Sequence, residues 1–435
     1  MKKSIIVIAF ICSFIIGSKA QPLPAVAQSE PILIMNATAH IGNGKVIEKA
    51  LIAFENGKIT IVDNVQTSRI DMSKFKKVIN AAGNHVYPGM ISMSTDLGLV
   101  EIIAVRQTVD HTETGDMNPS VRSIVAYNTD SQVPPTVRSN GILLAQITPN
   151  GGRISGQSSV VELDAWNWED AAYKFDEGVH VNFPALFSGG FDFLSGGFAQ
   201  RKNENFAKQI TELEQFFSEA KAYAAMTSPS PKNLKFEAMR DLFSQKKTLY
   251  IHANLVKEIT EGVLFGKKMG CKTVIVGGRD AYLVTDILKS NNVAVILDET
   301  QALPARVDDD IDQPFKSPAM LKAAGIPFTL SVNGHWQQRN LPLMAGQAVA
   351  FGLGYEDAVT AVTLEPAKIL GIDKTVGSLE EGKDATLIIT EGDVFDMRTS
   401  KVKQAFIRGK EIDLTNKQTD LYKRFKTKYD RLGGK

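Results

Sequence analysis

The sequence predicts an α/β protein: a (β/α)8 TIM-type barrel with a composite β-sandwich side domain built from both ends of the chain. Two observations predict this fold. From Tyr87 onwards, short apolar runs are separated by helical stretches, which is typical of βα units. Before and after that region, apolar runs are separated by turn signals instead, as in antiparallel sheets. Eight candidate strands in the central region favour a closed barrel over a doubly wound sheet.

The composition is that of an ordinary folded protein. The 435 residues include 49 Lys and Arg against 48 Asp and Glu, which leaves a formal net charge of +1. Hydrophobic residues make up 43%, enough to bury a large core and to exclude wholesale disorder. A net charge so close to zero attracts no polyanion, so we expect no nucleic-acid partner.

Residues 1–20 have the pattern of a secretory signal peptide. A basic start, Met1-Lys2-Lys3, precedes the apolar run Ile5 to Ile16, and Ser18-Lys19-Ala20 has the small-x-small pattern of a cleavage site. The alternative is a buried N-terminal helix. The run is too short for a stable membrane span, and no later stretch is longer and as apolar. We therefore expect an exported protein, periplasmic or secreted, with no stable membrane span.

The side domain is predicted from two separate segments, residues 21–86 and 373–412. In the first segment, Asn56-Gly57 is a hairpin signal between two apolar runs. The second segment has the same character and returns after the barrel, so the simplest packing joins both into one domain. The candidate strands of the two segments lie at 32–34, 50–54, 58–62, 385–389 and 405–407.

The barrel is assigned to residues 87–372. Between its fourth and fifth strands, Phe206, Ile210, Leu213 and Phe217 recur at helical spacing. The eight candidate strands lie at 90–91, 142–147, 160–163, 179–183, 249–251, 273–276, 293–297 and 328–332.

Residues 413–435 form a basic C-terminal tail with a helical pattern. Leu421, Phe425 and Leu432 fall on one side of this helix. Because the stripe is short and weakly apolar, we interpret it as a surface that docks on the body of the protein rather than on a membrane.

Three motifs resemble the amidohydrolase superfamily. Tyr87-Pro88-Gly89-Met90-Ile91 is similar to the start of its first barrel strand, usually Pro-Gly-Leu-Ile-Asp. Leu364 to Gly371 resembles its closing helix, and Gly377 to Leu387 resembles its return to the β-sandwich. The most similar subgroup is the exported imidazolonepropionase-like amidohydrolases. The resemblance implies hydrolysis of C–N bonds in cyclic amides or amides, by water that a metal activates at the barrel mouth.

The resemblance also implies that most metal ligands are replaced. The family has Asp-x-His-x-His after the first strand, whereas this chain places Ser94 and Asp96 at the two histidine positions. His252 matches the fifth-strand histidine, and Gly277 stands where the sixth-strand histidine is expected. Asn333 stands at the position of the eighth-strand aspartate, and an amide cannot take a proton from water at neutral pH.

The residues themselves lead to the same expectation. The chain has six histidines, with no His-x-His and no His-Glu-x-x-His among them. A catalytic zinc needs about three protein ligands. His252 and Asp96 are the candidate ligands for one divalent metal, zinc being the first choice. The supplements are His180, Asp298 and His335; Asp298 is also a candidate base, or a residue that caps the following turn.

Two glycine-rich loops are further candidates. Pro149 to Ser158 can cradle an anion with Arg153 clamping a carboxylate, or can be a structural turn. We name Arg153 and His335 as candidate substrate-binding residues. Leu186 to Phe198 can cover a pocket, lie on the surface, or contact another subunit.

Two functions follow from these observations. The first is an exported amidohydrolase that hydrolyses a small amide or cyclic amide with an atypical metal site. The second is a catalytically silent relative, which binds a small molecule or joins an intact amidohydrolase in a homo- or hetero-oligomer. Since function depends on the site rather than on the fold, the two hypotheses share one architecture.

Overall fold

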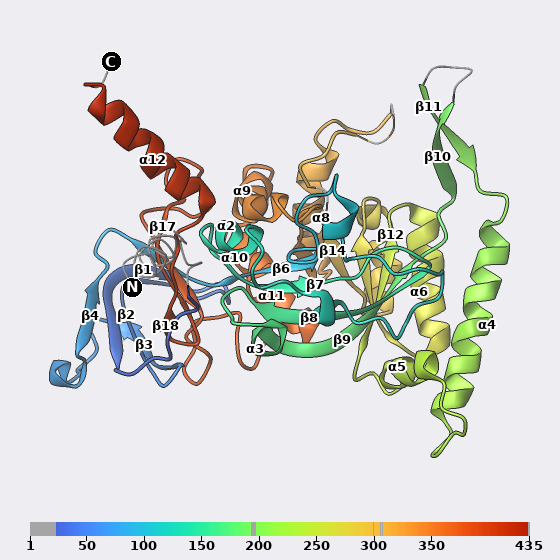
Figure 1. The fold of residues 1–435 in the computed structure, drawn as a ribbon, viewed down its shortest axis with the longest axis horizontal. Helices are drawn as coiled ribbons and strands as arrows, with labels where there is room; N and C mark the ends of the chain where they lie inside the picture. The colour runs from blue at the N-terminus through green and yellow to red at the C-terminus, as the bar shows by residue number, and fades with distance from the viewer. Residues whose placement is uncertain (1–22, 193–196, 299, 305, 307, 434–435) are drawn as a thin grey trace, which may run out of the picture.

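The computed structural model describes residues 23–192, 197–298, 300–304, 306 and 308–433. A β-sheet domain and a barrel lie beside each other, and the C-terminal helix projects from the side of the sheet domain (Figure 1). The signal peptide expected at residues 1–20 lies outside the described residues. No described helix has the length and apolar character needed to cross a membrane.

Strands from both chain ends form the side domain, as predicted. Its sheet has the order β18-β17-β16-β5-β1-β2-β3, with β4 paired to β1. The two ends meet where β16 pairs antiparallel with β5. Phe54 and Phe406, one from each end, pack edge to face in the core of this domain at 5.1 Å between ring centroids. The strands are β1 (Ile32–His40), β2 (Val46–Glu55), β3 (Lys58–Asn64), β4 (Lys77–Asn80), β5 (His85–Pro88), β16 (Leu387–Thr390), β17 (Val402–Ile407) and β18 (Lys410–Glu411).

The turn between β2 and β3 shows how local sequence sets this sheet. Asn56 and Gly57 have φ of 51° and 77°, and Glu55 pairs with Lys58 across the turn. A two-residue turn with positive φ at both positions matches the twist of a hairpin, and Asn-Gly is the pair that adopts it most easily.

All eight predicted barrel strands are present, and within the described residues they form one sheet in the order β15-β14-β13-β12-β9-β8-β7-β6. The expected βα units make neighbouring strands parallel, and one strand departs from this arrangement. β8 runs antiparallel to both β7 and β9. Only residues 148–153 join β7 to β8, and a parallel crossover needs a dozen residues or more. The strands are β6 (Met90–Thr95), β7 (Ile142–Ile147), β8 (Ile154–Glu162), β9 (Ala172–Asn182), β12 (Thr248–Ala253), β13 (Lys272–Gly277), β14 (Ala294–Leu297) and β15 (Phe328–Leu330).

Side chains hold the seam between the first and last barrel strands. The hydroxyl of Ser331, just after β15, donates to the carbonyl oxygen of Met93 in β6 at 2.5 Å. Gln338 lies buried beside the same seam, where it accepts a hydrogen bond from Ser92 and donates to the carbonyl oxygen of Gly334 at 3.1 Å. These contacts bring the strand ends of the barrel into one mouth.

Helices cover the outside of the barrel. The predicted stripe on α4 is buried at Leu213 and Phe217. The hairpin of β10 (Phe187–Asp192) and β11 (Gly197–Lys202) stands out from the body near α4 (Figure 1). The helices are α2 (Val133–Arg138), α3 (Trp168–Ala171), α4 (Phe206–Ala224), α5 (Leu234–Phe243), α6 (Val256–Met269), α7 (Thr285–Ser290), α8 (Gln313–Ala324), α9 (Leu341–Ala350), α10 (Tyr355–Val362), α11 (Leu364–Leu370) and α12 (Lys417–Arg431).

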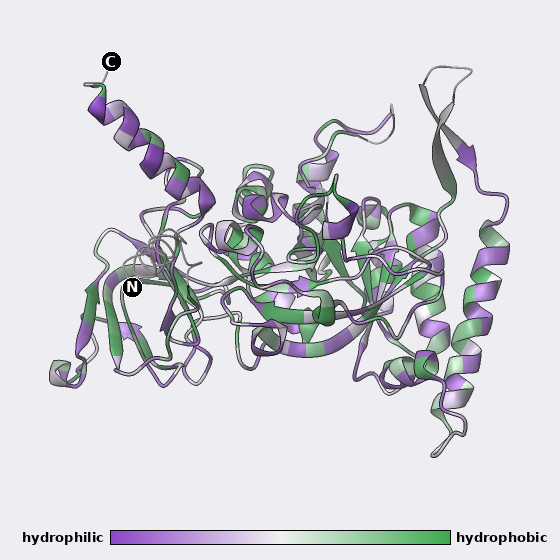
Figure 2. Cartoon of the chain, viewed as in Figure 1, coloured by the Kyte–Doolittle hydropathy of each residue, from purple (hydrophilic) through white to green (hydrophobic). Residues whose placement is uncertain are grey.

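The prediction that the C-terminal helix docks on the body is wrong. Leu421, Phe425 and Leu432 are all exposed. α12 is attached through its first two turns: the side chain of Asn416 caps the helix and also donates to Ser139 at 3.0 Å, and Leu421 and Arg424 border a cavity shared with the barrel. Beyond these turns the helix leaves the body, and it carries both hydrophilic and hydrophobic residues along its length (Figure 2).

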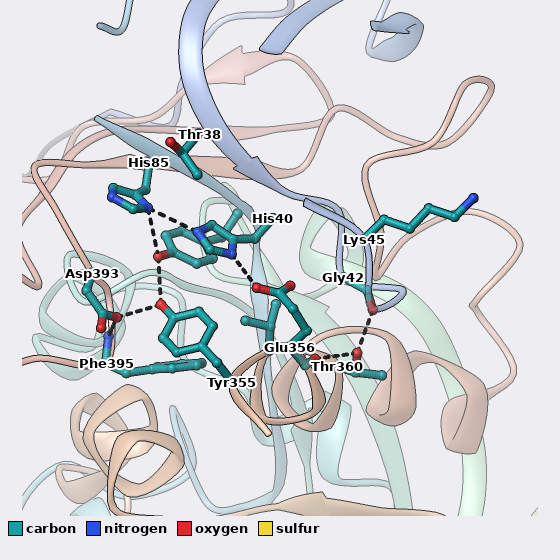
Figure 3. Close-up of polar contacts among 12 residues, drawn as sticks. Thr38, His40, Gly42, Lys45, His85, Tyr355, Glu356, Thr360, Asp393 and Phe395 are labelled. Atoms are coloured by element: carbon teal, nitrogen blue, oxygen red, sulfur yellow. Dashed lines mark hydrogen bonds and ion pairs between the residues drawn. The ribbon is translucent and has the colours of Figure 1, made fainter. Parts of the chain in front are cut away.

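A polar cluster joins the side domain to the barrel (Figure 3). His40 at the end of β1 contacts Glu356 of α10 at 2.7 Å, and its other ring nitrogen contacts His85 of β5 at 3.0 Å. The ring of His40 stacks on Tyr87 at 4.3 Å, and the Tyr87 hydroxyl contacts that of Tyr355 at 2.9 Å. His40 and His85 therefore lie at the interface between the two domains, away from the mouth of the barrel.

Candidate active site

Four sequence-predicted residues lie at the carboxyl ends of parallel barrel strands. Asp96 follows β6, His252 lies near the end of β12, Gly277 ends β13, and Asp298 follows β14. Because these strands point the same way, their ends meet at one mouth, which is where (β/α)8-type enzymes place their active sites.

The histidines of neighbouring strands form a pair inside the barrel. His180 of β9 is fully buried, and its Nδ1 lies 2.9 Å from Nε2 of the partly buried His252. On its other side, Nε2 of His180 lies 2.9 Å from the hydroxyl of Ser158 in β8. Tyr250, directly opposite His180 in the parallel register, stacks on its ring at 4.5 Å. Both ring nitrogens of His180 are thus engaged, which holds the imidazole in one orientation.

A buried carboxylate stands behind this pair. Glu177 of β9 accepts hydrogen bonds from Ser158 at 2.5 Å, from the amide of Gln146 at 2.6 Å and from Tyr250 at 2.9 Å. The side-chain oxygen of Gln146 in turn accepts a hydrogen bond from the backbone N–H of Ser94 at 3.0 Å, which ties the network to β6. A buried carboxylate is tolerated only when such donors surround it.

Burial keeps both histidines neutral. Burial lowers the pKa of His252 to about 4 and, together with the neighbouring His252, lowers that of His180 well below its usual value. Burial also raises the pKa of Glu177, against the three hydrogen bonds that lower it. Both imidazoles are therefore neutral at pH 7. The hydroxyl of Ser158 donates its proton to Glu177, so it accepts a hydrogen bond from Nε2–H of His180. Nδ1 of His180 then carries no proton and accepts a hydrogen bond from Nε2–H of His252.

The first-strand positions have an irregular backbone. Ser94 has a φ of 48°, in the left-handed region, and the pairing register of β6 with β7 shifts between Ser92 and Thr95. The regular alternation of side chains along the strand is interrupted there. Asp96 makes a contact of 3.1 Å with Nδ1 of His111, a residue of the loop that follows β6.

Gly277 and Asp298 line a small cavity of about 30 Å³ at the mouth. The volume holds about one water molecule. Gly277 has a φ of 94°, and a Cβ atom there would lie 2.6 Å from the side-chain oxygen of Asn254. Any other residue at this position is both strained and obstructed. Beside the cavity, Arg306 contacts both carboxylate oxygens of the buried Asp280, at 3.0 and 2.9 Å.

The remaining predicted residues are distributed around the mouth. Asn333 is exposed after β15, and His335 is buried next to Trp336. Arg153 forms ion pairs with Asp116 at 3.0 Å and with Glu212 of α4 at 2.8 Å, so its guanidinium fastens the loop after β7 to that helix.

Comparison with known proteins identifies the family. Residues 144–412 match the model of the amidohydrolase family. The chain belongs to the amidohydrolase family. This amidohydrolase has no match among curated protein sequences.

Solved structures share its fold. An amidohydrolase from Thermotoga maritima MSB8 is 21% identical with a TM-score of 0.74, and the match covers 88% of this chain and 99% of that one. The ochratoxinase of A. niger is 14% identical with a TM-score of 0.54, covering 90% and 98%. Molinate hydrolase is 14% identical with a TM-score of 0.52, covering 89% and 96%.

The histidine pair is the part of the mouth with the chemistry of metal ligands. Neutral imidazole is the form that binds metals, and His252 with His180 supplies two. A catalytic zinc uses three protein ligands and keeps a position for water. Within the described ranges, no three His, Cys, Asp or Glu side chains are placed to hold a metal ion together.

The sequence pointed to His252 and Asp96 but missed His111, which contacts Asp96. It also missed Glu177 and Gln146, which form the buried network behind the histidine pair. Of these, His111 is a loop residue with no motif around it. Gln146 did carry a signal, because it is a polar residue within the otherwise apolar strand Ile142–Ile147. Glu177 lies in a strand with several other polar residues and did not stand out. His180 was a candidate supplement, and the structure brings it, rather than Asp96, into hydrogen-bond contact with His252.

Proposed function

We propose that this protein is an exported, imidazolonepropionase-like amidohydrolase that has lost its hydrolytic metal centre and serves as the partner subunit of an intact relative. The family assignment supports the architecture, and the chemistry at the barrel mouth supports the loss of activity. In this role the barrel binds the intact relative and can also bind a small molecule.

One observation carries the proposal: the polar groups at the mouth bond to one another instead of converging on a common point. His252 bonds to His180, Asp96 contacts His111, and the carboxylate of Glu177 is enclosed by three donors. A water molecule can be activated only by a metal or a base with a free lone pair directed at it. The amide of Asn333 supplies neither.

Apolar side chains on the mouth loops support a partner subunit. Ile103, in the loop after β6, is 75% exposed, and Leu303 and Ile311, in the segment after β14, are 87% and 69% exposed. Exposed apolar side chains on the loops at one end of a barrel are a feature of surfaces that another protein covers.

Metal analysis of the purified mature protein, prepared without chelators, tests the loss of activity. We expect well below one bound metal ion per chain, and no hydrolysis of cyclic amides or amides when zinc is added. About one zinc per chain that is lost in His252→Ala and retained in His335→Ala would contradict the proposal. That result would favour the second candidate, an amidohydrolase that cleaves a small amide with an atypical metal site.

Affinity purification of the tagged chain from its native cells tests the partner. We expect it to bring down an amidohydrolase relative that carries Asp-x-His-x-His after its first barrel strand. A monomer that brings down no such relative under native conditions would refute the partner role.

Intact-mass measurement tests the export. The protein recovered from the periplasm or medium should begin at or near Gln21, because the signal pattern ends at Ala20. A recovered protein that retains Met1 would refute cleavage.

A further inference from the structure

Helix α12 is a basic amphipathic helix whose apolar face is uncovered. It begins with a capping box at Asn416 and runs for 15 residues, away from the body (Figure 1). Along Lys417–Arg431 the sequence holds six Lys or Arg residues and two Asp residues. Helices of this kind bind either a protein groove or a lipid surface.

The apolar face is continuous. At 3.6 residues per turn, its five large apolar or aromatic side chains fall within an arc of about 100°. Each of these side chains is exposed by 40–68% of its surface. They are Leu421, Tyr422, Phe425, Tyr429 and Leu432. Exposure of such a face to water is unfavourable, and transfer of the face into an apolar phase lowers the free energy.

Basic residues border that face on both sides. Arg424 and Lys428 lie along one edge and Lys426 along the other, while Asp420 and Asp430 lie on the opposite face. Long basic side chains at the edges of an apolar face can reach anionic headgroups while the aromatic rings enter the interface. The charge pattern therefore complements an anionic lipid surface.

The body of the protein and a second copy are poorer occupants. Contacts to the body lie in the first two turns. Thr136 of α2 donates to Gln418 at 2.8 Å, and Leu421 and Arg424 border a cavity that barrel residues also line. In a coiled coil of two copies, the seam through Leu421 and Phe425 would also contain Lys428. A lysine at the seam of two helices that are each strongly basic opposes their pairing.

We infer that α12 binds the surface of an anionic membrane, lying in the interface with Leu421, Phe425 and its neighbouring aromatic residues among the lipids. This role is independent of any activity in the barrel, and it would hold the protein at the membrane surface through one helix.

Vesicle co-sedimentation of the mature full-length chain tests the inference. We expect binding to vesicles of phosphatidylglycerol and phosphatidylcholine, and little binding to phosphatidylcholine alone. The variant Arg424→Gln/Lys426→Gln/Lys428→Gln should bind about 100-fold more weakly, since each basic residue near an anionic surface contributes about a factor of five to the binding constant. Leu421→Ser/Phe425→Ser should also lose binding, at unchanged charge.

A matched control is Lys232→Gln/Lys235→Gln/Lys246→Gln, which removes the same charge from exposed lysines around α5, at the other end of the molecule. It should bind as the parent does. Circular dichroism checks that every variant is folded. The inference fails if the parent does not bind the anionic vesicles, or if the control loses as much binding as the helix variant. It also fails if the apolar variant abolishes a dimer seen by ultracentrifugation while lipid binding is unchanged.

Discussion

Replacing His252 with Gln should remove a large part of the acid sensitivity of the barrel. Burial holds the pKa of His252 at about 4 in the folded protein, against 6.5 in an unfolded chain. The unfolded state therefore takes up a proton below pH 6.5, while the folded state resists until about pH 4. The stabilisation is complete above pH 6.5 and is lost as the pH falls towards 4. Gln keeps a donor for Nδ1 of His180 but has no proton to gain.

The two pKa values give the size of the effect. Between pH 7 and pH 5, a shift from 6.5 to about 4 lowers the free energy of unfolding by about 2 kcal/mol. His252→Gln should lack this loss, although His180 still contributes its own. At pH 7 the variant should be about 1 kcal/mol less stable than the parent, because one neutral hydrogen bond is weakened.

Urea denaturation followed by tryptophan fluorescence measures the effect. All three tryptophans, at 166, 168 and 336, lie in the barrel region, so the signal reports the barrel. Asn182→Ala is the matched control, because Asn182 is paired with His252 in the strand register and does not titrate. Its cost should be the same at both pH values. If the parent and His252→Gln lose equal stability between pH 7 and pH 5, the buried neutral imidazole is not the cause.

Three further substitutions test buried groups of the barrel, each by the urea midpoint at pH 7. Glu177→Ala should destabilise by about 3–6 kcal/mol, because it leaves three buried donors without an acceptor; a loss under 1 kcal/mol would contradict this. Gly277→His should cost about 2–4 kcal/mol through its positive φ and the clash with Asn254, so an unchanged midpoint would refute the strain argument. Arg138→Met should cost about 3–5 kcal/mol, because it leaves the buried carboxylate of Asp164 without its ion-pair partner. An unchanged midpoint would show that Asp164 does not depend on Arg138 for its charge balance.

The barrel strands could be predicted because buried strands leave apolar runs bounded by turn signals. All eight runs became strands, from Met90–Thr95 to Phe328–Leu330. Strand direction is not recorded in such a run. The antiparallel β8 could have been recognised only from its short connection at 148–153, where six residues leave no room for a helical crossover.

The candidate site was predicted in part for a similar reason. His252 and Gly277 lie at the ends of barrel strands, and the position of a strand end can be predicted from the sequence of that strand alone. The bond between His180 and His252 depends on the pairing of β9 with β12, which lie far apart in the chain. The stripe on α12 was read correctly as apolar, but a stripe does not reveal whether anything covers it.

The pairing of β5 with β16 has a consequence for the synthesis of the chain. About 300 residues separate the two strands, which at about 5–20 residues per second is roughly 15–60 s of translation. For that time one edge of β5 has no strand beside it, while the whole barrel emerges. Such an edge is a template for pairing with other chains. The strands that are synthesised last thus cover the open edge of β5. A chain that stops before Leu387 would leave that edge exposed and prone to aggregation.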